Sequence, residues 1–68
     1  MTRMTTERKL VVYGTYNDEI SARIIAEHLW LDQQRKATVM GVTEMHRMGH
    51  PLAPITTNRF AVIAEERG

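Results

Sequence analysis

Residues 17–36, NDEISARIIAEHLWLDQQRK, form the longest stretch of helix-favouring sequence in the chain and decide its fold. Neither Gly nor Pro interrupts the stretch. Asn17 is a good N-cap, because its side-chain oxygen can accept a hydrogen bond from an N–H of the first turn. Acidic residues follow at the positive end of the helix dipole, and Arg35 and Lys36 stand at the negative end. The stretch therefore predicts one long helix.

The apolar residues of this helix fall on two nearly opposite faces when they are placed at about 100° per residue. One face contains two alanines, which allow a close approach to a sheet, and its members are Ala22, Ile25, Ala26 and Leu29. The other face carries Ile20, Ile24 and Leu31. Because a small sheet covers only one side of a helix, we expect this second face to bind another molecule.

The length and composition of the chain indicate that it gains stability by associating with a second copy or with another protein. A chain of 68 residues forms one domain, and a single core of this size rarely contributes more than about 3–5 kcal/mol. The chain has no Cys, which excludes disulfides and thiolate metal sites and suits the cytoplasm. No apolar run approaches the roughly 18 residues of a membrane span, so no membrane partner is expected. We predict a cytoplasmic homodimer, or a chain that is stable only with a protein partner.

Three other segments read as strands, and they are residues 9–16 (KLVVYGTY), 37–46 (ATVMGVTEMH) and 59–65 (RFAVIAE). The last is the most continuously apolar, which favours a central position in a sheet. We predict a flexible tail over residues 1–8 and one α+β domain over residues 9–66. Its elements run β-α-β-β, with a three-stranded antiparallel sheet of order 1-3-2 and the long helix on one face. The alternative puts the second strand in the middle, in parallel with the first.

Side chains alternate along a strand, which divides the predicted sheet into two faces. The predicted core between helix and sheet contains Val12, Ile25, Ala26, Leu29, Val42, Phe60 and Val62. Val11 and Tyr13 fall on the other side of the first strand, and we group them with the second helix face as one dimer or partner face. Gly14 indicates a bulge or a close backbone approach, and a bulge there would invert part of the alternation.

Residues 47–58, RMGHPLAPITTN, have the Gly and Pro content of a loop. Hairpin loops usually contain about 2–5 residues, and longer ones are often functional or mobile. The functional interpretation is a partner-binding loop that uses Arg47, Met48, His50 and Leu52. The alternative is a turn without a binding role.

No catalytic motif is present, so we predict a protein that is not an enzyme and has no metal or cofactor. His46 and His50 have a spacing that could bind a metal on a helix, but they cross from a strand into a loop, and no carboxylate or thiolate completes the set. His28 and Asp32 could form a base and its orienting carboxylate, yet no nucleophile accompanies them.

The order of these segments resembles a family of small phage-encoded inhibitors. A KLVVYGTY strand, a helix with Ala22 and Ala26 four residues apart, a TVMGV segment and a closing RFAVIAE strand are similar to compact type I-F anti-CRISPR proteins, whose helix also leads into a Thr-Val-Met strand. The layout is also similar to small phage inhibitors of bacterial RNA polymerase. The resemblance covers residues 9–65 as a pattern of elements and implies an inhibitor that binds a protein or nucleoprotein complex.

The favoured function is therefore a non-enzymatic protein-binding module, and the expected target is a bacterial defence or transcription complex. The alternative is a nucleic-acid-binding accessory protein. Its contacts would be Arg8, Lys9, Arg35, Lys36, Arg47 and Arg59. The net charge of +1 and the mixing of both signs along the chain weaken this alternative.

Overall fold

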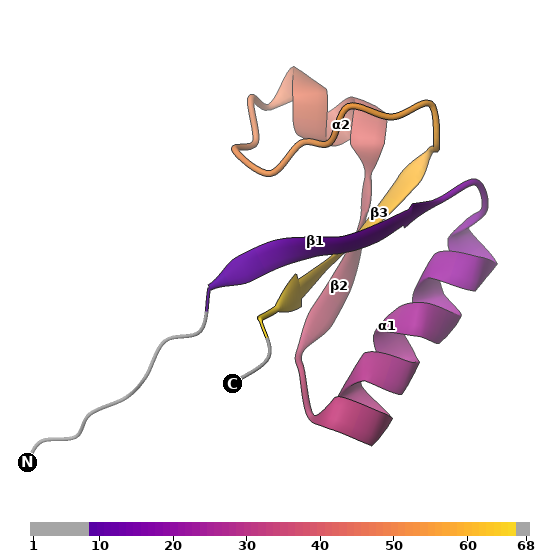
Figure 1. Cartoon of the computed structure of the whole chain (residues 1–68). Helices are drawn as coiled ribbons and strands as arrows, with labels where there is room; N and C mark the ends of the chain where they lie inside the picture. The colour runs from indigo at the N-terminus through magenta and orange to yellow at the C-terminus, as the bar shows by residue number, and fades with distance from the viewer. Residues whose placement is uncertain (1–8, 67–68) are drawn as a thin grey trace, which may run out of the picture.

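The computed structural model describes residues 9–66, and the predicted tail over residues 1–8 lies outside this range. Figure 1 shows a small sheet with a long helix along one side and a short helix at one end. The elements in chain order are β1 (Leu10–Tyr16), α1 (Glu19–Gln33), β2 (Ala37–Gly41), α2 (Val42–Arg47) and β3 (Phe60–Glu65).

The sheet has the order β1-β3-β2, and both pairings are antiparallel. The predicted α+β class and strand order are thus confirmed, and the alternative with the second strand in the middle is wrong. β3 is central because it is apolar on both sides. Its buried residues are Ala61, Val62, Ile63 and Ala64.

Helix α1 is shorter than the predicted stretch at both ends. Its N-cap is Asp18 and not Asn17, because the Asp18 carboxylate accepts hydrogen bonds from the Ser21 N–H at 2.7 Å and the Ser21 hydroxyl at 3.0 Å. The helix ends at Gln33, since Gln34 takes a left-handed conformation with φ of 52°. Arg35 therefore belongs to the turn that leads into β2.

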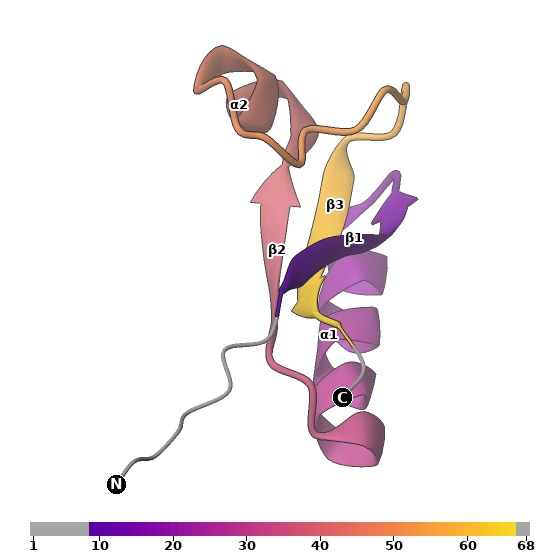
Figure 2. The same ribbon diagram turned by 60° about the vertical axis from the view of Figure 1, so that its left-hand side comes forward.

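The second predicted strand is wrong beyond Gly41, where the chain enters α2. Val42 and Met45 lie three residues apart, so a helical turn places both on one side, and both are buried. In a strand the same two residues would point to opposite faces. Figure 2 shows α2 beyond the end of β2, with α1 beside the sheet.

The interior consists of two clusters, one on each face of the sheet. The α1-side cluster contains the buried residues Ala22, Leu29, Val62 and Ala64, with Tyr16, Ile25, Ala26, Ala37, Val39 and Phe60 packed against them. The α2-side cluster contains Val42, Met45, Ala61 and Ile63, with Val12, Met40, Leu52 and Ala53 packed against them. The predicted core is correct for the α1 side except that Val12 and Val42 belong to the other cluster. The second face of the sheet is also partly covered, by α2 and by Leu52 and Ala53 of the loop that follows it.

A bulge in β1 accounts for part of this difference. Val12 pairs with Ile63 whereas Gly14 pairs with Val62, so the register shifts between them. The predicted bulge at Gly14 is confirmed. A Cβ at Gly14 would lie 2.6 Å from the Tyr16 hydroxyl oxygen, so a side chain there would displace the Tyr16 ring. Burial raises the pKa of the Tyr16 phenol, and the neighbouring phenol of Tyr13 adds to the rise.

Val11 does not lie on the outer face that the alternation predicted. It pairs with Ala64, whose side chain belongs to the α1-side cluster, and cross-strand partners share a face. Tyr13 stands in the bulge, where the Arg35 guanidinium carbon lies 5.5 Å from the centre of its ring. Arg35 is itself buried and donates from Nε to the Glu65 carbonyl at 2.6 Å. These two residues join the end of α1 to the sheet.

Candidate protein-binding surface

The outer face of α1 carries three large aliphatic side chains that residues 9–66 leave uncovered. Ile20, Ile24 and Leu31 are 72%, 48% and 66% exposed. They point away from the sheet, because the buried residues Ala22 and Leu29 lie on the opposite side of the helix. We call Ile20, Ile24 and Leu31 the outer face of α1.

A second candidate surface is the free edge of β2, which sequence reasoning missed. The Lys36 carbonyl accepts from the Glu65 N–H at 2.9 Å, and the Val42 N–H donates to the Arg59 carbonyl at 2.8 Å. Antiparallel ladders alternate, so the residues between these two points direct their backbone groups alternately toward β3 and away from it. The backbone N–H and C=O groups of Ala37, Val39 and Gly41 therefore point outward, and within residues 9–66 no strand pairs with them.

The opposite edge of the sheet, along β1, is protected. The bulge between Val12 and Gly14 breaks the regular spacing of its outward backbone groups. The Asn58 side-chain amide donates to the Thr15 carbonyl at 3.3 Å and to the Thr15 hydroxyl at 2.8 Å. Bulges and covering segments are the devices by which proteins prevent unwanted strand pairing. Strand β2, ATVMG, has no bulge, proline or charged residue, and this composition is the signal that could have identified its edge.

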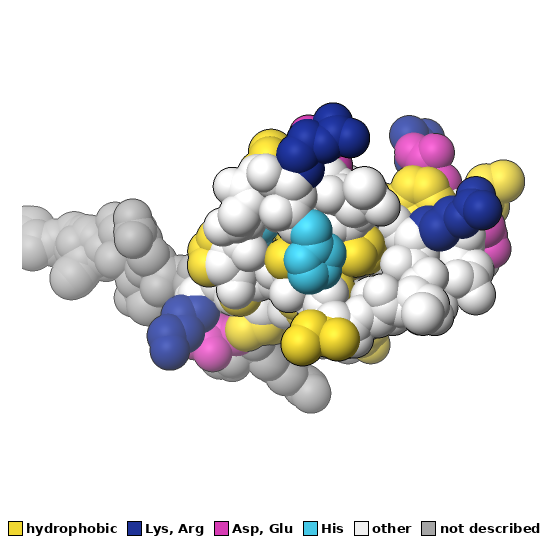
Figure 3. Space-filling model, turned by 90° about the horizontal axis from the view of Figure 1, so that it is seen from above, with side chains coloured by type: hydrophobic (Ala, Val, Ile, Leu, Met, Phe, Trp, Pro, Cys, Tyr) yellow, Lys and Arg dark blue, Asp and Glu magenta, His cyan; other side chains and the backbone are white. Residues whose placement is uncertain are grey.

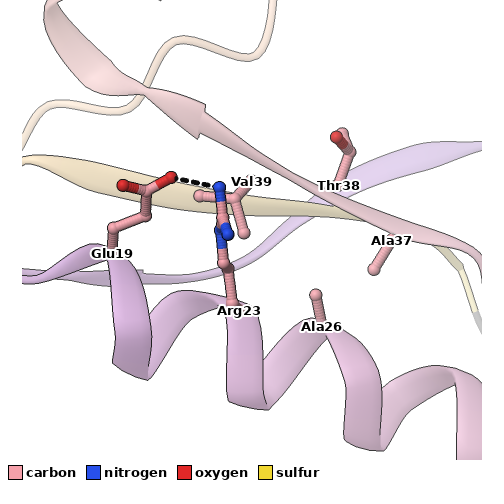
Figure 4. Close-up of a pocket in the computed structure, with 6 residues that line it drawn as sticks. All are labelled: Glu19, Arg23, Ala26, Ala37, Thr38 and Val39. Atoms are coloured by element: carbon pink, nitrogen blue, oxygen red, sulfur yellow. Dashed lines mark ion pairs between the residues drawn. The ribbon is translucent and has the colours of Figure 1, made fainter.

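A groove of about 310 Å³ runs between α1 and this edge. Figure 4 shows Ala26 of α1 facing Ala37 of β2, with the small side chains leaving the groove open, while Thr38 points away from the helix. Glu19 and Arg23 project from the first turns of α1 near Val39, and Arg23 Nη2 lies 2.7 Å from Glu19 Oε2. The groove thus combines small apolar side chains with one ion pair of opposite charges.

The four residues of the predicted binding loop have different environments. Arg47 ends α2, where its guanidinium lies 3.2 Å from the Glu44 carboxylate, and Met48 is 57% exposed. Leu52 packs against the α2-side cluster and donates its N–H to His50 Nδ1 at 3.0 Å. Arg47 and Met48 are thus available to a partner, whereas Leu52 helps to hold the loop on the sheet. Ile55, which sequence reasoning missed, is fully exposed in the same loop.

The six basic residues of the nucleic-acid alternative do not form one patch among those that the structure describes. Lys9 and Lys36 precede β1 and β2 at one end of the sheet, and Arg47 and Arg59 lie at the other end. Arg35 is buried, and Arg8 lies outside the described residues. Figure 3 shows the α2 end, where Lys and Arg side chains stand apart and Asp or Glu side chains lie beside them. Such an arrangement differs from the basic stripe that binds nucleic acid.

His46 and His28 contact other residues of the domain. His46 Nε2 donates to the Pro54 carbonyl at 2.7 Å and so fastens the loop to α2. His28 Nδ1 lies 3.4 Å from an Asp32 carboxylate oxygen, with both side chains exposed on the surface of α1. Over residues 9–66, no group of three or more His, Asp and Glu side chains is arranged to hold a metal ion.

No helix between residues 9 and 66 has the length and apolar character needed to cross a bilayer. Comparison of the chain with protein-family models, with curated proteins and with solved structures gave no match. The resemblance to phage-encoded inhibitors therefore stays a prediction from the order of the segments.

Proposed function

We propose that this chain is a non-enzymatic, cytoplasmic protein-binding module that contacts its partner through the outer face of α1. The observation that carries the proposal is the exposure of Ile20, Ile24 and Leu31 along one side of a single helix. Single exposed apolar residues are ordinary on protein surfaces, whereas neighbouring ones that form a patch are typical of interaction sites.

The size of this surface indicates what the partner must supply. Full burial of an aliphatic side chain contributes about 1.5–3 kcal/mol, and association itself costs about 4–15 kcal/mol. The three side chains therefore need help from neighbouring contacts. At about 100° per residue Glu27 stands between Ile24 and Leu31, and it is exposed. A partner that complements this face presents an apolar surface with a basic group opposite Glu27.

The partner class follows from the resemblance to phage-encoded inhibitors. A bacterial defence complex of the CRISPR type is the proposed target, and bacterial RNA polymerase is the alternative. In either case the module acts by occupying a surface of the complex. Arg47 and Met48, exposed at the other end of the molecule, are a proposed second contact region.

Affinity capture with two matched variants tests the module. Ile24→Lys places a charge in the outer face, and Asp32→Lys places the same charge about 80–120° around α1 from the three outer-face residues. Both sites are exposed, so each change should alter stability by less than about 0.5 kcal/mol. Proteins retained from a bacterial lysate by wild type and Asp32→Lys should be lost with Ile24→Lys. Equal retention by all three chains would show that partners bind elsewhere.

A phage plaque assay tests the inhibitor class. The chain is expressed in a bacterium whose type I-F CRISPR system blocks a phage, and plaques should then form with wild type and Asp32→Lys but not with Ile24→Lys. Growth arrest that depends on Ile24, without recovery of plaques, would favour the RNA polymerase alternative. An unchanged plaque count and normal growth with every variant would argue against both targets.

A further inference from the structure

We infer that two copies of this chain pair through their β2 strands, antiparallel about a two-fold axis at Val39, so that two three-stranded sheets become one continuous sheet. The free edge of β2 is the starting point. Its outward backbone donors and acceptors are regularly spaced, and no side chain of β2 is charged. The β1 edge, in contrast, is interrupted by a bulge and covered at Thr15. Evolved proteins generally protect an edge unless another strand adds to it.

The centre of β2 suits symmetric pairing. When the residue on the axis of a two-fold antiparallel pair directs its backbone outward, it exchanges its N–H and C=O with its own copy. Val39 is the middle residue of Ala37–Gly41, and its backbone groups point outward. Pairing at Val39 therefore overlaps the whole strand, with Ala37 opposite the second copy's Gly41.

The side chains around this axis are complementary to themselves. On the α1 side, small residues would face each other, because Ala37 meets glycine and Val39 meets valine. On the other side, Thr38 would face Met40. No two like charges meet across the strand pair, since β2 has none.

The charges of helix α1 favour a second copy of this chain as the partner of the β2 edge. Glu19 and Arg23 line the groove beside the edge, near the proposed axis (Figure 4). Under two-fold symmetry, residue i of one copy meets residue j of the other and the reverse. A pair of opposite charges near the axis can therefore form two intermolecular ion pairs, Glu19 with Arg23 and Arg23 with Glu19. Two like charges at these positions would repel.

The interface is small. A stable interface usually has about 20–30 residues on each side, and β2 with the adjoining edge of α1 supplies fewer. We therefore expect a dimer that dissociates on dilution. The outer face of α1 is not part of this interface, so the inference stands independently of the proposed function, and the dimer would present two outer faces on the same side of one sheet.

Sedimentation equilibrium of the whole chain, from about micromolar to millimolar concentration, gives the dissociation constant. Amide hydrogen exchange at the two ends of this range identifies the surface. The Val39 amide should gain protection at high concentration, whereas the Thr38 and Met40 amides, which point toward β3, should be protected throughout. A dimer that pairs through the outer face of α1 would leave the Val39 amide exchanging rapidly.

Charge variants of the groove add an independent readout. Arg23→Glu places like charges on both sides of the axis, and the dissociation constant should rise about tenfold, since each of two exposed pairs changes from attraction to repulsion. Combining it with Glu19→Arg restores opposite charges and should restore the wild-type constant. Arg23→Glu leaves two glutamates four residues apart on α1, which costs about 0.2–0.5 kcal/mol, and the double variant restores opposite charges there, so circular dichroism should show both folded.

Three results would overturn the inference. They are a monomer at millimolar concentration, a dimer whose Val39 amide is no better protected than in the monomer, and a charge-swapped chain that dimerises no better than Arg23→Glu alone. A monomer whose Val39 amide is protected by an added synthetic peptide of residues 36–42 would show instead that the edge accepts an extended segment without forming the symmetric pair.

Discussion

Met45 is the side chain on which the second layer of the molecule depends, and Met45→Ala is the sharpest test of that layer. The side chain is completely buried, at 0% exposure, between α2 and β3, where it packs with Val42, Ala61 and Ile63. Truncation of a buried methionine to alanine costs about 2–5 kcal/mol, and the cost is smaller where the surroundings can close the cavity. α2 is short and lies at the end of the sheet, so it can move inward. We therefore expect a loss of about 2–3 kcal/mol.

Urea unfolding monitored by far-ultraviolet circular dichroism measures this loss. A domain of this size has a core contribution of only about 3–5 kcal/mol, so the variant should be partly unfolded without denaturant. Protein concentration must be equal in all samples, because association would add to apparent stability. The slope of the free energy of unfolding against urea should not change, since the same surface is exposed on unfolding.

Met48→Ala is the matched control, because Met48 follows one turn later and is 57% exposed. Its free energy of unfolding should lie within about 0.5 kcal/mol of wild type. If Met45→Ala is as stable as Met48→Ala, α2 does not pack on the sheet in solution. The assignment of a second core cluster would then be wrong.

Two further predictions concern the sheet and the start of α1. Gly14→Ala should destabilise the domain by about 1 kcal/mol, because the new methyl group would lie 2.6 Å from the Tyr16 hydroxyl oxygen and displace the half-buried ring. Gly41→Ala, whose methyl group would meet nothing closer than 4.0 Å, should cost less in the same urea titration, and equal losses would contradict the close approach. Hydrogen bonds from the Ser21 N–H and hydroxyl hold the pKa of Asp18 below its ordinary value. Because the pKa of Asp18 is lower in the folded state than in the unfolded state, the carboxylate contributes its full stabilisation above the ordinary pKa of about 3.9. This stabilisation is lost as pH falls through the pKa of the folded state. Asp18→Asn keeps a good N-cap without titrating there, so its midpoint of thermal unfolding should fall less than that of wild type below about pH 4; parallel curves would refute the role of the carboxylate.

The sequence was sufficient for those parts of the fold that depend on long patterns. The uninterrupted helix and the run of apolar residues in RFAVIAE predicted α1, the central position of β3 and the strand order. The N-cap was misplaced by one residue, because Asn17 and Asp18 are both good caps and adjacent.

The second half of the chain was harder because VTEMHR suits two structures. Val42 and Glu44 continue the alternation of β2, whereas Val42 and Met45 have helical spacing. The helix forms because it buries both apolar residues on the α2 side of the sheet. Recognition of the free edge of β2 depended on where this strand ends. A strand that extends to His46 includes Glu44, whereas the true β2 has no charge and an outward-directed residue at its centre.

β3 lies between β1 and β2 in space but follows both in the chain. During translation, β1, α1 and β2 are therefore made before either strand has its partner, since β1 and β2 do not pair with each other. β2 can join β3 through the intervening residues 42–59, but the β1 ladder must bring Leu10 to Glu65. Long-range pairing is slow, because the entropy of loop closure is lost before contacts compensate for it. We expect β1 to dock last, so the sheet stays incomplete until the end of β3 has been made.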